Sequence, residues 1–226
     1  MAVSIIIPAF NRYELTAACV ESIQFYSPEH EIIVIDNGST DETRFAKVAI
    51  RNETNLGFAV SCNEGARAAS NEHLVFLNND TLVHQNWLAF TRHLHRPDVG
   101  CVGPKLIYPN GRIQSAGVGI DFNKTPGHEA WNMQSDWTTE PAEVPAVTGA
   151  CLGIRKELFD SFGGFDVTYW NGYEDIDLCL QASQAGYSNI YDPLAKVTHL
   201  ESQSGPERWT AVEANVHWLR TKWSPK

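Results

Sequence analysis

The sequence lacks the cysteine pattern of a zinc finger or a disulfide framework. Its five cysteines stand at scattered positions, and no two of them form a Cys-x-x-Cys pair. Neither a zinc site nor a set of disulfides is therefore indicated. We expect reduced, buried thiols of the kind found in cytosolic proteins.

Long apolar runs and an excess of basic residues are also missing. No stretch approaches the ~20 apolar residues that span a bilayer, and the apolar N-terminal stretch is too short for a signal peptide. The formal net charge of -10 disfavours a nucleic-acid partner. An acidic protein that binds an anionic ligand needs backbone N–H groups, a few Arg or Lys side chains, or a metal ion beside that ligand.

Motifs of several common nucleotide-binding and hydrolytic enzymes are absent as well. The sequence has no GxGxxG after its first expected strand, no GxxxxGK[ST] and no GxSxG. These absences disfavour a classical dinucleotide-binding domain, a P-loop NTPase and an α/β-hydrolase.

What the sequence does have is an alternation of strand and helix patterns in its first half. Hydrophobic residues make up 43% of the chain, which is enough for a packed core. This alternation favours an α/β fold with a largely parallel sheet, whose ligands bind beyond the carboxyl ends of the strands. We expect strands at 3–7, 31–35, 48–50 and 73–77, and helices at 15–26, 58–69 and 87–95.

The second half shows weaker periodicity. A loop from about 121 to 143 holds Trp131 and Trp137 and has the length of a functional lid, although tryptophans packed in a core fit equally well. We see no internal repeat. We expect strands at 105–108, near 113, and at 147–154, 188–191 and 196–199, and helices at 156–162, 174–185 and 207–223.

Polar clusters follow three of the expected strands, at 8–11, 36–39 and 78–80, and should meet around one crevice. Asp80 offers the kind of oxygen that a divalent cation bound to a diphosphate needs, although the same cluster also fits an Asx turn. With a late histidine, His199, the donor set suits Mn2+ better than Mg2+.

Two carboxylates, Glu174 and Asp175, begin an expected helix. The helix dipole favours negative charge there, so capping alone explains them equally well. Neighbouring helical residues point about 100° apart, which lets one carboxylate face the crevice as a general base. We expect Asp177 to be exposed, since Ile176 and Leu178 supply the apolar contacts of this helix.

At this point the chain resembles a known family, the family 2 glycosyltransferases, and most of all their bacterial rhamnosyltransferase-like branch. The resemblance runs from about residue 3 to residue 199. It rests on five blocks in the family's order: SIIIP at 4–8, VIDNGSTD at 34–41, NLGF at 55–58, NNDT at 78–81, and GGFD at 163–166 followed by YEDIDL at 173–178.

The resemblance implies a GT-A fold, with a Rossmann-like, mostly parallel central sheet flanked by helices and a small acceptor-side subregion. It implies a single domain over 1–226, in which 1–103 binds a nucleotide-sugar and 104–226 binds the acceptor. The implied donor-site residues are Pro8, Ala9, Asn11, Glu14, Asp36, Gly38, Ser39, Asn55, Gly57, Phe58 and Asn79.

The resemblance also assigns the chemistry. Asp175 matches the catalytic base, Glu174 and Trp170 the acceptor site, and Asp80 with His199 the site of Mn2+ or Mg2+. The implied reaction moves a sugar from a UDP- or dTDP-linked donor to a hydroxyl of a glycan or lipid-linked acceptor, with inversion, in cell-surface polysaccharide synthesis. A cytoplasmic protein is expected, and peripheral contact with the inner face of the membrane stays open.

Two rival functions stay open at this stage. A D-x-D motif would have Asp where this chain has Asn78, which leaves a non-catalytic nucleotide- or carbohydrate-binding protein as the alternative. A sugar-nucleotide pyrophosphorylase would share the architecture. It would need a glycine-rich loop with arginine after the first strand, and residues 8–12 do not match one.

Overall fold

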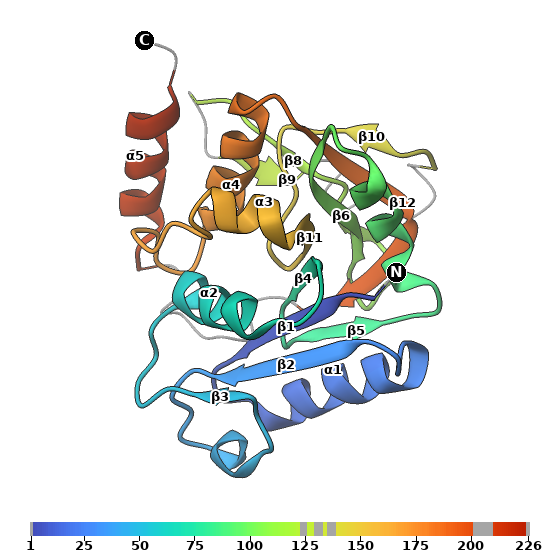
Figure 1. The fold of residues 1–226 in the computed structure, drawn as a ribbon, viewed down its shortest axis with the longest axis vertical. Coiled ribbons are helices and arrows are strands. Elements are labelled where there is room, and N and C mark those ends of the chain that lie inside the picture. The colour runs from blue at the N-terminus through green and yellow to red at the C-terminus, as the bar shows by residue number, and fades with distance from the viewer. Residues whose placement is uncertain (1, 123–125, 129–132, 135–138, 201–209, 225–226) are drawn as a thin grey trace.

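The fold is a mixed sheet with helices on both of its faces (Figure 1). The computed structural model describes residues 2–122, 126–128, 133–134, 139–200 and 210–224. Along the main sheet the strand order is β10-β12-β6-β11-β4-β1-β2-β3, with β5 paired to β12 and β7 paired to β6. Trp131 and Trp137 lie outside the described residues, so the interpretation of their loop as a lid stays a prediction.

The first half follows the expected alternation. Strands β1 (Ser4–Ala9), β2 (Glu31–Asp36), β3 (Ile50–Arg51) and β4 (His73–Leu77) pair in parallel. Because side chains alternate along a strand, Ile5 and Ile7 join the core cluster that contains residues of helix α1 (Tyr13–Tyr26). Ile6 joins the opposite cluster with residues of helix α2 (Phe58–Ala68). The two helices therefore cover opposite faces of the same strands (Figure 1).

The second half adds strands of mixed direction. Strand β11 (Cys151–Arg155) pairs antiparallel with β4 and with β6 (Val99–Ile107). Strand β12 (Ser188–His199) pairs in parallel with β6, and both run in the same direction as β1 to β4, so the expectation of a mostly parallel sheet holds apart from β11 and the short strands β5, β7 and β10, which pair antiparallel. Strand β12 is one strand where two were expected. Its register against β6 shifts between Asp192 and Lys196, and this irregularity interrupts the sequence pattern.

The remaining elements are short, apart from two helices. Strand β5 (Thr81–Val83) pairs antiparallel with the end of β12, so that Thr81 lies opposite His199. The segment at 87–95 is a 3-10 helix, η2 (Trp87–His95). The others are η1 (Glu42–Phe45), β7 (Ile113–Ser115), β8 (Val118–Gly119), β9 (Gly127–His128), β10 (Ala142–Glu143), α3 (Lys156–Ser161), α4 (Glu174–Gln184) and α5 (Val212–Trp223).

The expectation for Asp177 was wrong, because its side chain is fully buried. Its carboxylate accepts hydrogen bonds from the Tyr169 hydroxyl at 3.1 Å and the Trp223 indole N–H at 2.7 Å, and pairs with Lys222 at 2.9 Å. The last two partners come from α5, which packs over this part of α4. Helical periodicity along α4 alone gives no sign of a second helix that covers its polar positions.

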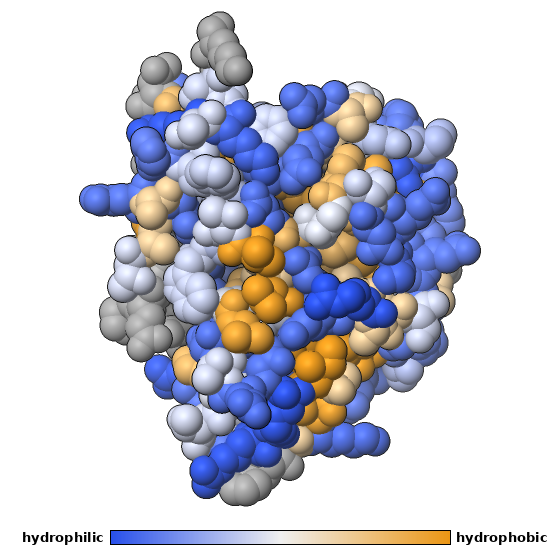
Figure 2. Space-filling model, turned by 60° about the vertical axis from the view of Figure 1, so that its left-hand side comes forward, coloured by the Kyte–Doolittle hydropathy of each residue, from blue (hydrophilic) through white to orange (hydrophobic). Residues whose placement is uncertain are grey.

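The five cysteines are all buried and free of disulfides. Hydrophilic residues cover most of the face in Figure 2, and hydrophobic residues gather in its middle. Among the described residues, no helix combines the length and the apolar character that a membrane crossing requires.

Candidate active site

A cavity of about 200 Å³ opens at the carboxyl ends of β1 and β4. The chain after β1 contributes Phe10, the chain after β4 contributes Asn78 to Asp80, and the start of α4 contributes Glu174 and Asp175. The turn after β2 contributes Asn37 alone. The polar clusters expected to meet at one crevice therefore do so, although the 36–39 cluster takes part through one residue.

Five of the residues predicted for the donor site line this cavity: Pro8, Ala9, Asn55, Phe58 and Asn79. Asn37, which the sequence did not single out, holds this wall in place. Its side-chain amide donates to Asn55 Oδ1 at 2.8 Å, and its Oδ1 accepts from the Leu56 N–H at 3.0 Å. Its position inside the 36–39 cluster was the available signal.

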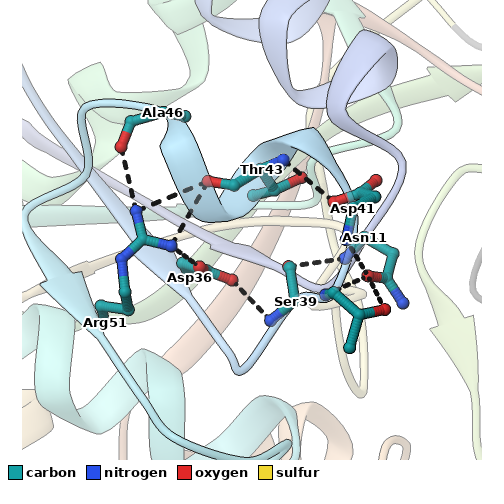
Figure 3. Close-up of polar contacts among 8 residues, drawn as sticks. Asn11, Asp36, Ser39, Asp41, Thr43, Ala46 and Arg51 are labelled. Carbon is teal, nitrogen blue, oxygen red and sulfur yellow. Dashed lines mark hydrogen bonds and ion pairs between the residues drawn. The ribbon is translucent and has the colours of Figure 1, made fainter.

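The other predicted donor-site residues lie outside the cavity lining, and their donor roles stay predictions. Asp36 is buried, accepts from the Ser39 N–H at 2.9 Å and forms an ion pair with Arg51 (Figure 3). Asn11 Oδ1 accepts from the Thr40 N–H at 2.8 Å. These bonds shape the 36–41 turn that stands behind the cavity. The predicted donor-site residues that do not line the cavity are Asn11, Glu14, Asp36, Gly38, Ser39 and Gly57.

Both predicted glycines of this region sit where a side chain would be strained. Gly38 has φ +79°, and a Cβ there would lie 2.5 Å from the backbone carbon of Thr54. Gly57 has φ +84°, and a Cβ there would lie 3.1 Å from the Trp170 ring. A positive φ at both positions favours glycine. Trp170 itself packs beside Gly57 and does not line the cavity, so its acceptor role also stays a prediction.

Asp80 and His199 meet across the pairing of β5 with β12. His199 Nε2 lies 3.0 Å from Asp80 Oδ1 and 3.2 Å from Asn78 Nδ2, and the Asp80 and His199 side chains are both buried. Within the described part of the chain, no group of three or more His, Cys, Asp or Glu side chains could hold a metal ion. A carboxylate with an imidazole fits Mn2+ and would leave its other coordination positions to ligand oxygens.

The acid pair at the start of α4 has two different environments. Glu174 is buried, and its Oε2 accepts from the Gly172 N–H at 2.7 Å. Burial, together with the nearby Asp175 charge, raises the pKa of Glu174 to about 8. Asp175 is only half-buried at the cavity wall, and burial raises the pKa of its carboxyl group as well. Near neutral pH, Glu174 therefore keeps a proton.

The Asp175 carboxylate is held by backbone donors. Its Oδ2 accepts from the Gly149 N–H at 2.6 Å, and its Oδ1 accepts from the Ile176 N–H at 2.8 Å. Asp175 also borders a second hollow of about 190 Å³, which His128, Tyr173 and Val212 line. The carboxylate thus stands between two recesses, which suits a group that acts on two ligands.

The segment before α4 is bent and tied down. Asn171 and Tyr173 have φ of 50° and 77°, in the left-handed region. Asn171 Oδ1 accepts from the Phe58 N–H at 2.8 Å, which joins this segment to the start of α2. Asn215 of α5 donates to the carbonyl oxygens of Trp170 and Gly172, both at 2.9 Å. Sequence reasoning missed both asparagines, because each lies far along the chain from its partners.

A mixed α/β sheet with an Asp–His pair and an acid pair on one cavity is the architecture of a GT-A glycosyltransferase fold. The family model described as Glycosyl transferase family 2 matches residues 4–163. The chain belongs to this family.

Curated relatives agree with that family. The chain is 34% identical to the uncharacterized protein y4gI of Sinorhizobium fredii, over 98% of this chain and 27% of that protein. It is 31% identical to the O-antigen biosynthesis protein RfbC of Myxococcus xanthus, over 99% of this chain and 20% of that protein. It is 28% identical to an N-acetylglucosaminyl-diphospho-decaprenol L-rhamnosyltransferase of Mycobacterium tuberculosis, over 76% of this chain and 67% of that protein. The chain thus spans about a quarter of the first two relatives.

Solved structures share the fold. GalNAc-T7 with UDP, GalNAc and Mn2+ superposes with a TM-score of 0.76 at 21% identity, covering 97% of this chain and 48% of that one. The mannosyltransferase PcManGT of Pyrobaculum calidifontis, with GDP-Man and Mn2+, gives a TM-score of 0.71 at 20% identity, covering 99% and 65%. These similarities confirm the predicted GT-A fold.

Proposed function

We propose that this chain is an inverting, metal-assisted glycosyltransferase domain. It moves a sugar from a UDP- or dTDP-linked donor to a hydroxyl of a glycan or lipid-linked acceptor in cell-surface polysaccharide synthesis. The observation that carries the proposal is that the Asp80–His199 pair and Asp175 line the same cavity. We further propose that residues 1–226 act as one domain, on the cytoplasmic side and in peripheral contact with the membrane.

The charge of the cavity supports a requirement for a cation. Its described lining holds the carboxylates of Asp80 and Asp175 beside the protonated Glu174, and no Lys or Arg side chain. A diphosphate placed there would be repelled unless a cation accompanied it. Asp80 and His199 would hold Mn2+ or Mg2+, which when bound neutralises the charge that grows on the departing diphosphate. Two structural neighbours were solved with Mn2+.

The transfer step assigned to this chain's residues is a single displacement. Asp175 accepts the proton of the acceptor hydroxyl, and the hydroxyl oxygen forms a bond to the anomeric carbon of the donor sugar. The bond from that carbon to the diphosphate oxygen breaks on the opposite side, so the configuration inverts. The raised pKa of Asp175 makes it a stronger base than a solvated aspartate.

The two recesses separate the ligands in this proposal. The donor occupies the cavity between the ends of β1 and β4, against Asn55 and Phe58. The acceptor enters through the hollow that Tyr173 and Val212 line, and its hydroxyl reaches Asp175 where the two spaces meet. We assign Glu174 and Trp170 to the acceptor side as well, although Glu174 lines the donor cavity and neither residue lines the hollow.

One observation favours a second candidate, a non-catalytic nucleotide-binding domain. Asn78 stands where a D-x-D motif has a carboxylate, and its amide lies 3.2 Å from His199 Nε2. A domain of this kind would bind the donor and release no nucleoside diphosphate.

The Asp175→Asn variant separates the two candidates. The wild type should release nucleoside diphosphate from UDP- or dTDP-sugars when glycan and polyprenyl-diphosphate-linked acceptors are supplied. The variant should lose this release by about 10²-fold or more, as expected for a lost general base, at unchanged donor affinity. Asp160→Asn, an exposed change in α3, is the matched control. Full activity of the Asp175 variant would remove this residue from the mechanism.

A further inference from the structure

A buried amide at the cavity has one end bonded and the other end without a partner. Gln114 lies in β7, is 1% exposed and lines the cavity. Its Oε1 lies 2.6 Å from His199 Nδ1, whereas its Nε2 finds no hydrogen-bond partner in the described part of the chain. Burial of an amide N–H without an acceptor is unfavourable, so a site built this way is completed by a ligand.

The Oε1 atom of Gln114 determines which nitrogen of the His199 imidazole carries the proton. When Nδ1–H donates to Gln114 Oε1, the lone pair of His199 is on Nε2, the atom that lies 3.0 Å from Asp80 Oδ1. In this tautomer Nε2 can accept from the Asn78 amide at 3.2 Å, but it also faces the nearer carboxylate oxygen of Asp80, and a cation shared between Nε2 and that oxygen would remove their repulsion. The partner of the second ring nitrogen commonly fixes which nitrogen of a histidine ligand faces the metal.

Strand pairing in the sheet brings the side chains of Gln114 and His199 together. Strand β6 pairs with β7 on one side, with Ile107 opposite Ile113, and with β12 on the other, with Ile107 opposite Thr198. Gln114 and His199 directly follow these partners of Ile107. Both side chains are therefore fixed by strands, which hold a ligand set more firmly than loops do.

We propose that Gln114 is a positioning residue for the cation site and a contact for the donor. Its carbonyl oxygen holds His199 as the Nδ1–H tautomer, and its unpartnered N–H donates to a diphosphate oxygen of the bound donor. The proposal rests on the proposed function in that it assumes a donor diphosphate and a cation in this cavity.

The tautomer of His199 in ligand-free protein tests the first half without any substrate. Two-bond 15N–1H spectra are recorded about two pH units above the usual histidine pKa of about 6.5, and the His199→Asn variant identifies the signal. The wild type should show the Nδ1–H form, and Gln114→Leu should convert it to the Nε2–H form or a mixture. A wild-type Nε2–H form, or no change in Gln114→Leu, would overturn the positioning role.

The affinity for Mn2+ alone, from titration followed by electron paramagnetic resonance, gives an independent readout. Gln114→Leu should weaken binding about 10- to 100-fold, the range typical for loss of an orienting partner. Gln114→Glu keeps an acceptor for Nδ1–H and should retain the affinity. Gln24→Leu, the same change at an exposed position of α1, is the control. Equal affinities in Gln114→Leu and the control would contradict the proposal.

The contact with the diphosphate is read from the side-chain amide signal of Gln114, which is identified by its absence from the Gln114→Leu spectrum. The signal should shift when UDP or dTDP is added with Mg2+, and should stay in place with uridine or thymidine. A stationary signal while a diphosphate binds would exclude the contact. If neither diphosphate binds the wild type, the proposed function fails along with the contact, whereas the tautomer experiment still decides the pairing of Gln114 with His199.

Discussion

Glu174 and Asp175 are neighbours in sequence, yet the fold gives them different surroundings. Glu174 is buried against the 171–173 segment, whereas Asp175 stands between two recesses and is held by the Gly149 N–H. A protonated Glu174 adds no charge to the cavity, which leaves Asp175 as the carboxylate that can accept a proton. The division of roles therefore comes from burial rather than from residue type.

The raised pKa of Glu174 predicts a pH-dependent loss of stability. The folded state keeps a proton up to about pH 8, whereas the unfolded chain releases it near 4.5. The free energy of unfolding should therefore fall as pH rises through this window. Glu174→Gln cannot lose a proton, so its melting temperature should exceed that of the wild type by a margin that grows between these pH values. Each 1 kcal/mol corresponds to about 2–4 °C in a domain of this size.

Differential scanning calorimetry across this range measures the effect, and Glu157→Gln, an exposed change in α3, serves as the control. A difference between Glu174→Gln and the wild type that does not vary with pH would mean that Glu174 is ionised in the folded protein.

Single residues also show which parts of the candidate site could be predicted from the sequence. Asp80 and Asp175 were proposed from motif blocks and His199 as a late histidine, and the structure brings all three to one cavity. Gln114, Asn171 and Asn215 could not be proposed, because a polar residue gains a role only when tertiary structure supplies its partner. Asp177 was misplaced for the same reason.

At the scale of elements, α5 is bound to the site through α4. The Asp177 carboxylate accepts hydrogen bonds from the side chains of Tyr169, Gln181, Lys222 and Trp223. Asn215 of α5 donates hydrogen bonds to the segment that precedes Glu174 and Asp175. The C-terminal helix therefore supports the geometry of the segment that carries Glu174 and Asp175, although it lies outside the residues that the family model matches.

Asp177→Ala should therefore be strongly destabilising. It removes one of the two carboxylates that pair with Lys222, which keeps Asp166 at 3.1 Å. It also leaves the half-buried Trp223 indole N–H and the Tyr169 hydroxyl without their acceptor. A buried donor that is left without its acceptor costs about 1–3 kcal/mol. Urea denaturation should show a loss of this order, against a small effect of Asp160→Ala. A change as small as that of the control would mean that α5 contributes little to the fold.

The positions of most elements followed from local patterns. Apolar runs located β1, β2 and β4, helical spacing located α1 and α4, and alanine content located α2. Strand direction beyond β4 could not be predicted, because β11 enters the sheet between β4 and β6, far from both in sequence. The shift of register in β12 made one strand look like two.

At the scale of the whole molecule, the negative charge of the chain opposes the binding of the anionic donor that the proposed function requires. A chain of net charge -10, with the carboxylates of Asp80 and Asp175 in its cavity, is proposed to bind a diphosphate. No Lys or Arg side chain lines this cavity among the described residues, so the proposed function assigns the compensating charge to a cation beside Asp80 and His199, and donor binding should depend on the metal.

The most direct measurement is the melting temperature with UDP and dTDP, each with and without Mn2+, for the wild type and Asp80→Ala. A ligand at about 100 times its Kd adds about 2.7 kcal/mol, or about 5–10 °C here. The account predicts such a shift in the wild type with at least one nucleotide, only when Mn2+ is present, and none in Asp80→Ala. No shift with either nucleotide, or an equal shift without Mn2+ and in the variant, would contradict it.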